Sequence, residues 1–309
     1  MIHAAATAGK RDARAALAEA VIDLARCASI ELNVGDIPLL AASREFLTPG
    51  TRVYVSHLPK QEWAGTRDAS RAVRAAGFEP IPHVPVRLIA AAEDLDCLLG
   101  QLTQEAGASE VLLIAGDYAK ARGPYSNVSD VLRTGLLEKH GLARVSLAGH
   151  PEGHPTIPLD QIRSAERDKS ALAAQRGIEC TLLTQFFFES APFLAWTREL
   201  RSTGVRSKLV AGLAGPARLG TLLKYAARCG VGASIRALGS RPNLVLKLSS
   251  DRGPERLVHD LAAAREAGLP MDGMHLFCFG GFLRTCRWLA TVAAGRFVLE
   301  ESSLKLEVR

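Results

Sequence analysis

The chain is poor in aromatic residues, has no long apolar run and contains no paired cysteine motif. Aromatic side chains make up 6% of its 309 residues. They are not interleaved with basic residues, which argues against a nucleic-acid surface. No apolar stretch reaches the length of a membrane span. Residues 1–28 carry scattered charges instead of the apolar core of a signal peptide, so they indicate an amphipathic helix and a cytoplasmic protein.

Familiar metal and nucleophile motifs are also missing. The six cysteines form no CxxC pair and no cluster with zinc spacing. His150 and His154 are four residues apart, but Pro151 and Pro155 make this segment a loop, so we predict no metal site. There is no GxSxG elbow, no Walker loop and no HExxH. The formal net charge of +6 is spread along the chain and suits an anionic small molecule.

What is present is a regular alternation of strand and helix patterns. Eight apolar segments predict strands, at 28–34, 51–58, 79–86, 109–117, 143–150, 179–187, 207–215 and 273–281. Helical spacing between and after them predicts helices at 62–77, 91–107, 127–141, 159–177, 190–204, 218–230, 254–268 and 281–295. This pattern favours an α/β fold, a (β/α)8 TIM barrel over residues 1–309 as a single domain. An open doubly wound sheet is the competitor, but no GxGxxG follows the first strand.

Two additions to the barrel are expected. The amphipathic N-terminal segment precedes the first strand as a helix. The stretch 231–272 is longer than one connection needs, so we predict extra helices between strands seven and eight.

Active sites of such barrels lie at the carboxyl ends of the strands. Glu31 lies inside an apolar strand, where a carboxylate is either paired with a buried cation or catalytic. Asp117 follows a strand and is either a helix cap or a site residue. His83 is either a core histidine or a ligand-binding one. Gln185, in TQFFFES, is predicted to be buried and to need a partner for its amide. A carboxylate and an amide together match a planar heterocycle such as a pterin.

Five segments, in order, resemble methylenetetrahydrofolate reductases: SIEL, the PHV of PIPHVPV, AGD before Tyr118, HPEGHP and TQFFFE. They lie between Ser29 and Glu189. The resemblance implies a barrel that binds FAD at the strand ends. It implies that NADH or NADPH reduces the flavin, which then reduces 5,10-methylenetetrahydrofolate to 5-methyltetrahydrofolate, with the physiological direction open.

The resemblance also assigns roles by position. Glu31 matches the acid that protonates N10 of the folate, Asp117 the aspartate that meets flavin and pterin, and Gln185 the pterin-binding glutamine. Positions that touch FAD in the family are Ser56, His83, Gly116, His150 and His154. The consecutive phenylalanines 186–188 are interpreted mainly as packing residues.

Several positions depart from the family pattern. Ala115 stands where an arginine is common, Leu219 where a phenylalanine stacks on substrate, and Ala173 where a lysine is usual. Lys169, one helical turn earlier, is the candidate to reach the FAD diphosphate, and Arg284 is nearest to the arginine that meets the folate tail. These departures leave two alternatives open, a folate- or flavin-binding partner subunit without turnover and a flavin-independent reductase. The choice of nicotinamide and the oligomeric state stay open.

Overall fold

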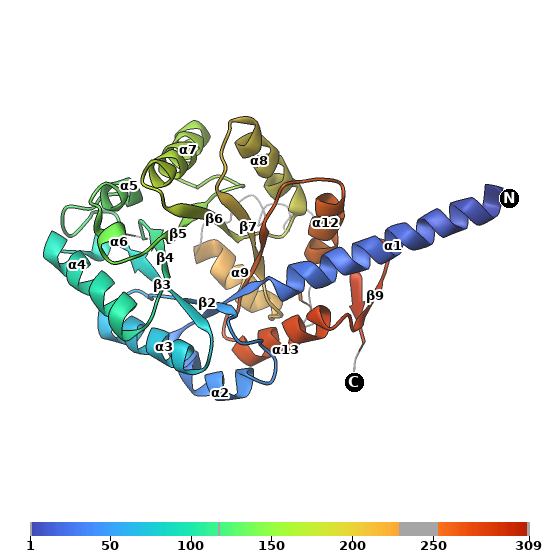
Figure 1. The fold of residues 1–309 in the computed structure, drawn as a ribbon, viewed down its shortest axis with the longest axis horizontal. Helices are drawn as coiled ribbons and strands as arrows, with labels where there is room; N and C mark the ends of the chain where they lie inside the picture. Colours follow the sequence, from blue (N-terminus) through green and yellow to red (C-terminus); the bar gives the residue numbers. More distant parts are fainter. Residues whose placement is uncertain (1, 117, 229–252, 308–309) are drawn as a thin grey trace.

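The eight predicted strands form one closed parallel barrel (Figure 1). The computed structural model describes residues 2–116, 118–228 and 253–307. Each strand pairs in parallel with the next in sequence, and β8 pairs with β1 to close the ring. The strands are β1 Ser29–Leu32, β2 Arg52–Val55, β3 Glu79–Pro85, β4 Glu110–Ile114, β5 Arg144–Gly149, β6 Glu179–Phe186, β7 Lys208–Ala214 and β8 Gly273–Phe277. The prediction of a TIM barrel is confirmed, and the open-sheet alternative is wrong.

Helices surround the barrel where the sequence predicts them. The longer ones are α3 Trp63–Ala75, α4 Ala92–Gly100, α7 Leu159–Gln175, α8 Ser190–Ser202, α9 Leu219–Arg228, α12 Glu255–Glu266 and α13 Phe282–Ala293. Short helical segments are η1 Val34–Leu39, α2 Leu40–Ser43, η2 Val86–Leu88 and the π segment η3 Gln101–Glu105. The expected extra helices between strands seven and eight fall largely on residues 229–252, which lie outside the described residues.

One predicted helix is divided in two. The segment 127–141 contains α5 Val128–Leu132 and α6 Leu136–Lys139. Gly135 separates them with φ of +78°, a left-handed conformation that glycine adopts without steric cost and that a continuous helix excludes. The single-helix prediction was wrong here because helical periodicity continues across a break in the backbone.

The N-terminal segment forms the expected helix, α1 Ile2–Arg26, which packs against α12 and α13. In Figure 1 its first turns extend away from the barrel. A small antiparallel hairpin, β9 Phe297–Leu299 and β10 Leu304–Leu306, follows α13 and was not predicted. No helix in the described part of the chain is long and apolar enough to cross a membrane.

Side chains alternate along the strands between the outside and the inside of the barrel, and this forms two separate cores. Outward residues such as Val53, Val55 and Leu182 are buried beneath the helices. Inward residues fill the barrel, including a buried cluster of Tyr54, Ile81, Leu112, Leu183 and Val210.

The amino-terminal end of the barrel interior is charged. Arg52 and Arg144 lie 2.7 and 3.6 Å from the buried carboxylate of Glu110. The Ser146 hydroxyl donates to Glu110 and lies 2.8 Å from the Tyr54 hydroxyl. Since the active face of such barrels is the opposite one, we interpret this network as a stabilising element.

Candidate functional site

Glu31 and His83 meet inside the barrel, close to its carboxyl-terminal mouth. They project from β1 and β3, and the carboxylate Oε2 lies 4.0 Å from the imidazole Nε2. The inward residues at this level on β5 and β7 are Ala148 and Gly212, which add little side-chain volume. The alternation of a closed barrel places these four strands' side chains in one layer. The layer therefore presents two polar groups facing two small residues.

The surroundings of Glu31 favour the protonated form of its carboxyl group. Its side chain is 21% exposed. Burial raises the pKa of Glu31 to about 8, and the nearby carboxylate of Asp36 adds to this effect. Among the described residues, no Lys or Arg lies within ion-pair distance of Glu31, so the alternative of a pair with a buried cation finds no support. The side chain is protonated at neutral pH and is suited to act as a general acid.

The imidazole of His83, beside this acid, and that of His57, close to His83, are both neutral. Burial, and then the nearby His57, lower the pKa of His83 to about 3. Burial lowers the pKa of His57 to about 4. The His57 ring stacks on Trp63 at 4.0 Å, and its Nδ1 lies 2.8 Å from the Thr66 hydroxyl. The resulting site is polar but carries no charge on Glu31, His57 or His83 at pH 7.

The structure corrects the prediction that Gln185 is buried. It is exposed, whereas its neighbours Thr184 and Phe186 are each 1% exposed, so the expected buried glutamine is wrong. The pairing of β6 with β7 shifts register between Leu183 and Phe186. This irregularity changes which residues at the strand end face the helices. Gln185 thus lies at the rim of the mouth instead of within the core.

The three phenylalanines after Gln185 separate into different environments. Phe187 packs outward on Phe193, with ring centroids 5.5 Å apart. Phe186 packs instead with Phe279 and Phe277, at 4.9 and 6.1 Å. An aromatic cluster therefore lines the β6–β8 side of the mouth. Phe279 has φ of +43°, an outlier for a bulky residue and of a kind that concentrates at functional sites.

The loop after β5 is held by a buried ion pair that the sequence analysis did not find. The Glu166 carboxylate, 1% exposed, accepts hydrogen bonds from the His150 backbone N–H at 2.7 Å and from the Trp196 indole at 2.9 Å. Arg163 donates to Glu166 and to the carbonyl oxygen of His150, at 3.0 Å each. The pair lies three residues apart on α7, which is a common helical spacing and gave no distinctive signal. It fixes the backbone of His150 on both sides.

Other predicted site residues lie in the following places. Ser56 is buried and donates to the carbonyl oxygen of Leu32 at 3.1 Å. Ala115 and Gly116 follow β4, and Gly116 has φ of +84°. His154 is exposed in the loop after β5, with its ring 6.2 Å from that of His150. Asp117 lies outside the described residues.

Three further predicted residues lie on the surrounding helices. Lys169 on α7 donates its Nζ to the carbonyl oxygen of Ala148 at 3.2 Å, and burial lowers the pKa of Lys169. Arg284 is exposed in the first turn of α13, which follows β8. Leu219 begins α9 after β7, and its side chain lies outside the described part. Helices that follow strands begin near the mouth, so Arg284 and Leu219 lie on the expected face.

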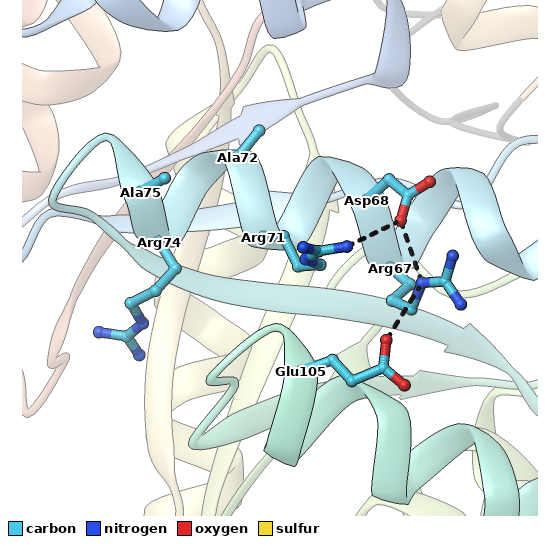
Figure 2. A pocket seen from close by; sticks show the side chains of 7 residues that line it. All are labelled: Arg67, Asp68, Arg71, Ala72, Arg74, Ala75 and Glu105. Atoms are coloured by element: carbon cyan, nitrogen blue, oxygen red, sulfur yellow. Dashed lines mark hydrogen bonds and ion pairs between the residues drawn. The ribbon is translucent and has the colours of Figure 1, made fainter.

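A groove elsewhere on the surface does not belong to this site. Figure 2 shows it on the outer side of α3, against η3. Arg67 there pairs with Asp68 at 3.0 Å and with Glu105 at 3.6 Å. The groove is lined by residues of α3 and η3 on the outside of the barrel wall and contains none of the predicted site residues, so we assign it no part in the chemistry.

Comparisons with known proteins find only weak similarity to solved structures. No protein-family model matches the chain. Tryptophan synthase from M. tuberculosis is 14% identical with a TM-score of 0.47, over 89% of this chain and 96% of that chain. Dihydropteroate synthase from Thermus thermophilus is 12% identical with a TM-score of 0.47, over 86% of this chain and 91% of that chain. Likeness at this level transfers no activity, so the functional proposal depends on the chain's own residues.

Proposed function

We propose that the protein is an enzyme that reduces 5,10-methylenetetrahydrofolate to 5-methyltetrahydrofolate with a hydride from NADH or NADPH. The observation that carries this proposal is the protonated Glu31 at the barrel mouth, with its pKa raised to about 8 by burial. The ordered resemblance of the strand ends to methylenetetrahydrofolate reductases supplies the substrate class. Gln185, which is exposed at the end of β6, is the residue that we assign by this resemblance to the pterin edge.

The reaction needs an acid of this kind. Opening the imidazolidine ring breaks the bond between the methylene carbon and N10, and N10 takes a proton as the bond breaks. The Glu31 carboxyl gives that proton, and the methylene carbon becomes an iminium at N5. Hydride addition to that carbon gives the methyl group. An acid with a pKa near the working pH is suited to both holding and giving the proton.

FAD, which the resemblance implies, fits these residues only in part. His83 offers a buried polar atom at the mouth. A flavin dinucleotide also carries a diphosphate, which cations or backbone N–H groups must meet. Lys169 is the cation among the predicted FAD residues, and its Nζ is engaged with the Ala148 carbonyl oxygen. Ala115 has no charge to offer. The proposed reaction therefore contains no step that depends on a flavin.

The partial fit to FAD favours a second candidate for the same overall reaction, in which the hydride passes directly from the nicotinamide to the folate. Reduction with NADH carrying two deuterium atoms at C4 separates the two routes. Direct transfer places deuterium in the product methyl group. A reduced flavin exchanges its N5 hydrogen with water, so a flavin route loses much of the label to solvent.

The proposed function is tested by incubating the purified protein anaerobically with each nicotinamide and methylenetetrahydrofolate, while recording the visible spectrum and the product. We expect 5-methyltetrahydrofolate to form. The flavin route adds a visible chromophore that bleaches with the nicotinamide and returns with the folate. Tight folate binding with no nicotinamide oxidation would replace the enzyme proposal by the partner-subunit alternative.

A further inference from the structure

Two imidazole nitrogens inside the barrel have no hydrogen-bond partner among the residues that the structure describes. They are the Nε2 atoms of His83 and His275. His83 is 9% exposed and His275 is 0% exposed. A buried polar atom without a partner is costly, and native proteins pair nearly all such atoms with protein or with ordered water. One of them, His83 Nε2, lies 4.0 Å from the Glu31 carboxylate, and the two together indicate a small polar partner inside the barrel.

The rings of His83 and His275 are held against one common neighbour, Tyr54. His275 lies opposite Ser29 in the pairing of β8 with β1, and its Nδ1 is 2.9 Å from the Ser29 hydroxyl. Both His275 and His83 pack edge-on against Tyr54, with centroids 4.7 and 6.2 Å away. Glu31 follows Ser29 by two residues, so its side chain faces the same interior one level closer to the mouth.

The spacing of Glu31 and His83 points to a bridge. Glu31 Oε2 and His83 Nε2 are 4.0 Å apart. This is too long for a hydrogen bond and is a span that one water closes with two bonds. Buried waters make about three hydrogen bonds on average, and His275 Nε2 offers the third. The pKa of His275 agrees with this closeness, since it is lowered by burial and, second, by the neighbouring His83.

We propose that one water molecule is held between Glu31, His83 and His275, and that it positions Glu31 for proton transfer. The water donates to Glu31 Oε2 and to His83 Nε2, and it accepts from the N–H at His275 Nε2. Ser29 then donates its hydroxyl to His275 Nδ1. The acidic proton of Glu31 is left on Oε1, and the water stabilises the carboxylate as that proton leaves.

This arrangement makes His83 and His275 positioning residues with opposite tautomers. His83 carries its proton on Nδ1, and His275 carries it on Nε2. The structural part of the inference is independent of the reaction, whereas its consequence for catalysis depends on the proposed reductase function. Its tests therefore include readouts that do not require activity.

The first test is a crystal structure of the wild-type protein at a resolution that shows ordered water, together with nitrogen-15 spectra of its histidines. Loss of one signal in His275→Leu assigns that ring. We expect a water within about 3.2 Å of all three side chains and opposite tautomers for the two histidines. A dry interior, a direct bond between Glu31 and His83, or matching tautomers would overturn the proposal.

The second test uses His275→Leu, because His275 lies too deep to touch a ligand at the mouth. We expect kcat for folate reduction to fall by roughly tenfold, the lower end of the effect of outer-shell partners, with KM for the folate unchanged. Ser29→Ala is the milder variant and serves if His275→Leu does not fold. A change in KM with kcat intact contradicts the positioning role. If the wild type shows no reduction, the reductase proposal fails while the water and tautomer tests still decide this inference.

Discussion

The protonated state of Glu31 makes a prediction about stability that needs no substrate. The folded protein holds the proton more tightly than the unfolded chain, since burial raises the pKa from 4.5 to about 8. The stability that this proton contributes is therefore fully present below pH 4.5, and the free energy of unfolding falls as the pH rises from there toward 8. A tenfold change in proton affinity is worth about 1.4 kcal/mol. The full rise sets an upper limit of about 5 kcal/mol on this loss.

The expected loss is smaller, because the side chain is 21% exposed and water reaches the carboxylate. We expect Glu31→Gln to gain about 2–3 kcal/mol in unfolding free energy relative to wild type between pH 5 and pH 8.5. Urea unfolding at several pH values measures this difference. Comparing the two proteins removes the contributions of His57 and His83, which are common to both. Glu19→Gln, at an exposed position on α1, is the matched control and should show no such change. A difference between Glu31→Gln and wild type that stays constant with pH would refute a protonated Glu31.

Two further substitutions test the architecture around the mouth. Glu166→Gln should lower the unfolding free energy by about 3–5 kcal/mol, since it removes the buried carboxylate charge that faces Arg163. Glu199→Gln removes the second carboxylate on the same arginine, which is 46% exposed, and should cost under about 1 kcal/mol. Equal losses in urea unfolding would contradict a structural role for the buried ion pair. Gly212→Ala should destabilise the barrel by about 3 kcal/mol or more, because the added methyl meets a backbone oxygen of β6 at 2.2 Å. Gly220→Ala, with no atom within 4 Å of the new methyl, should be neutral or stabilising when both variants are compared with wild type by thermal unfolding.

The barrel was predictable because each of its units repeats the same local pattern. Apolar strands end at polar residues, and helices end at glycine, so the order of elements follows from the chain. The N-terminal helix was visible for the same reason. The break at Gly135 was not, since the helical spacing of apolar residues continues across it.

The candidate site was predictable only where a residue type is unusual for its place. Glu31 stood out because a carboxylate inside an apolar strand requires an explanation. Gln185 was misjudged because an irregular pairing of β6 with β7 moves it to the rim, and sequence periodicity does not reveal such a shift. His275 was missed because one histidine in an apolar strand has no partner that the sequence identifies. Its role depends on Ser29, 246 positions away in the chain.

The most direct test of the central claim is the rate of 5-methyltetrahydrofolate formation by wild type and Glu31→Gln, with NADH or NADPH as reductant. We predict a loss of at least about 100-fold in Glu31→Gln, as expected for removal of a general acid, with the folate still bound. The wild-type rate should fall as the pH rises through about 8, where Glu31 loses its proton. A Glu31→Gln variant that forms the product at the wild-type rate would contradict the account.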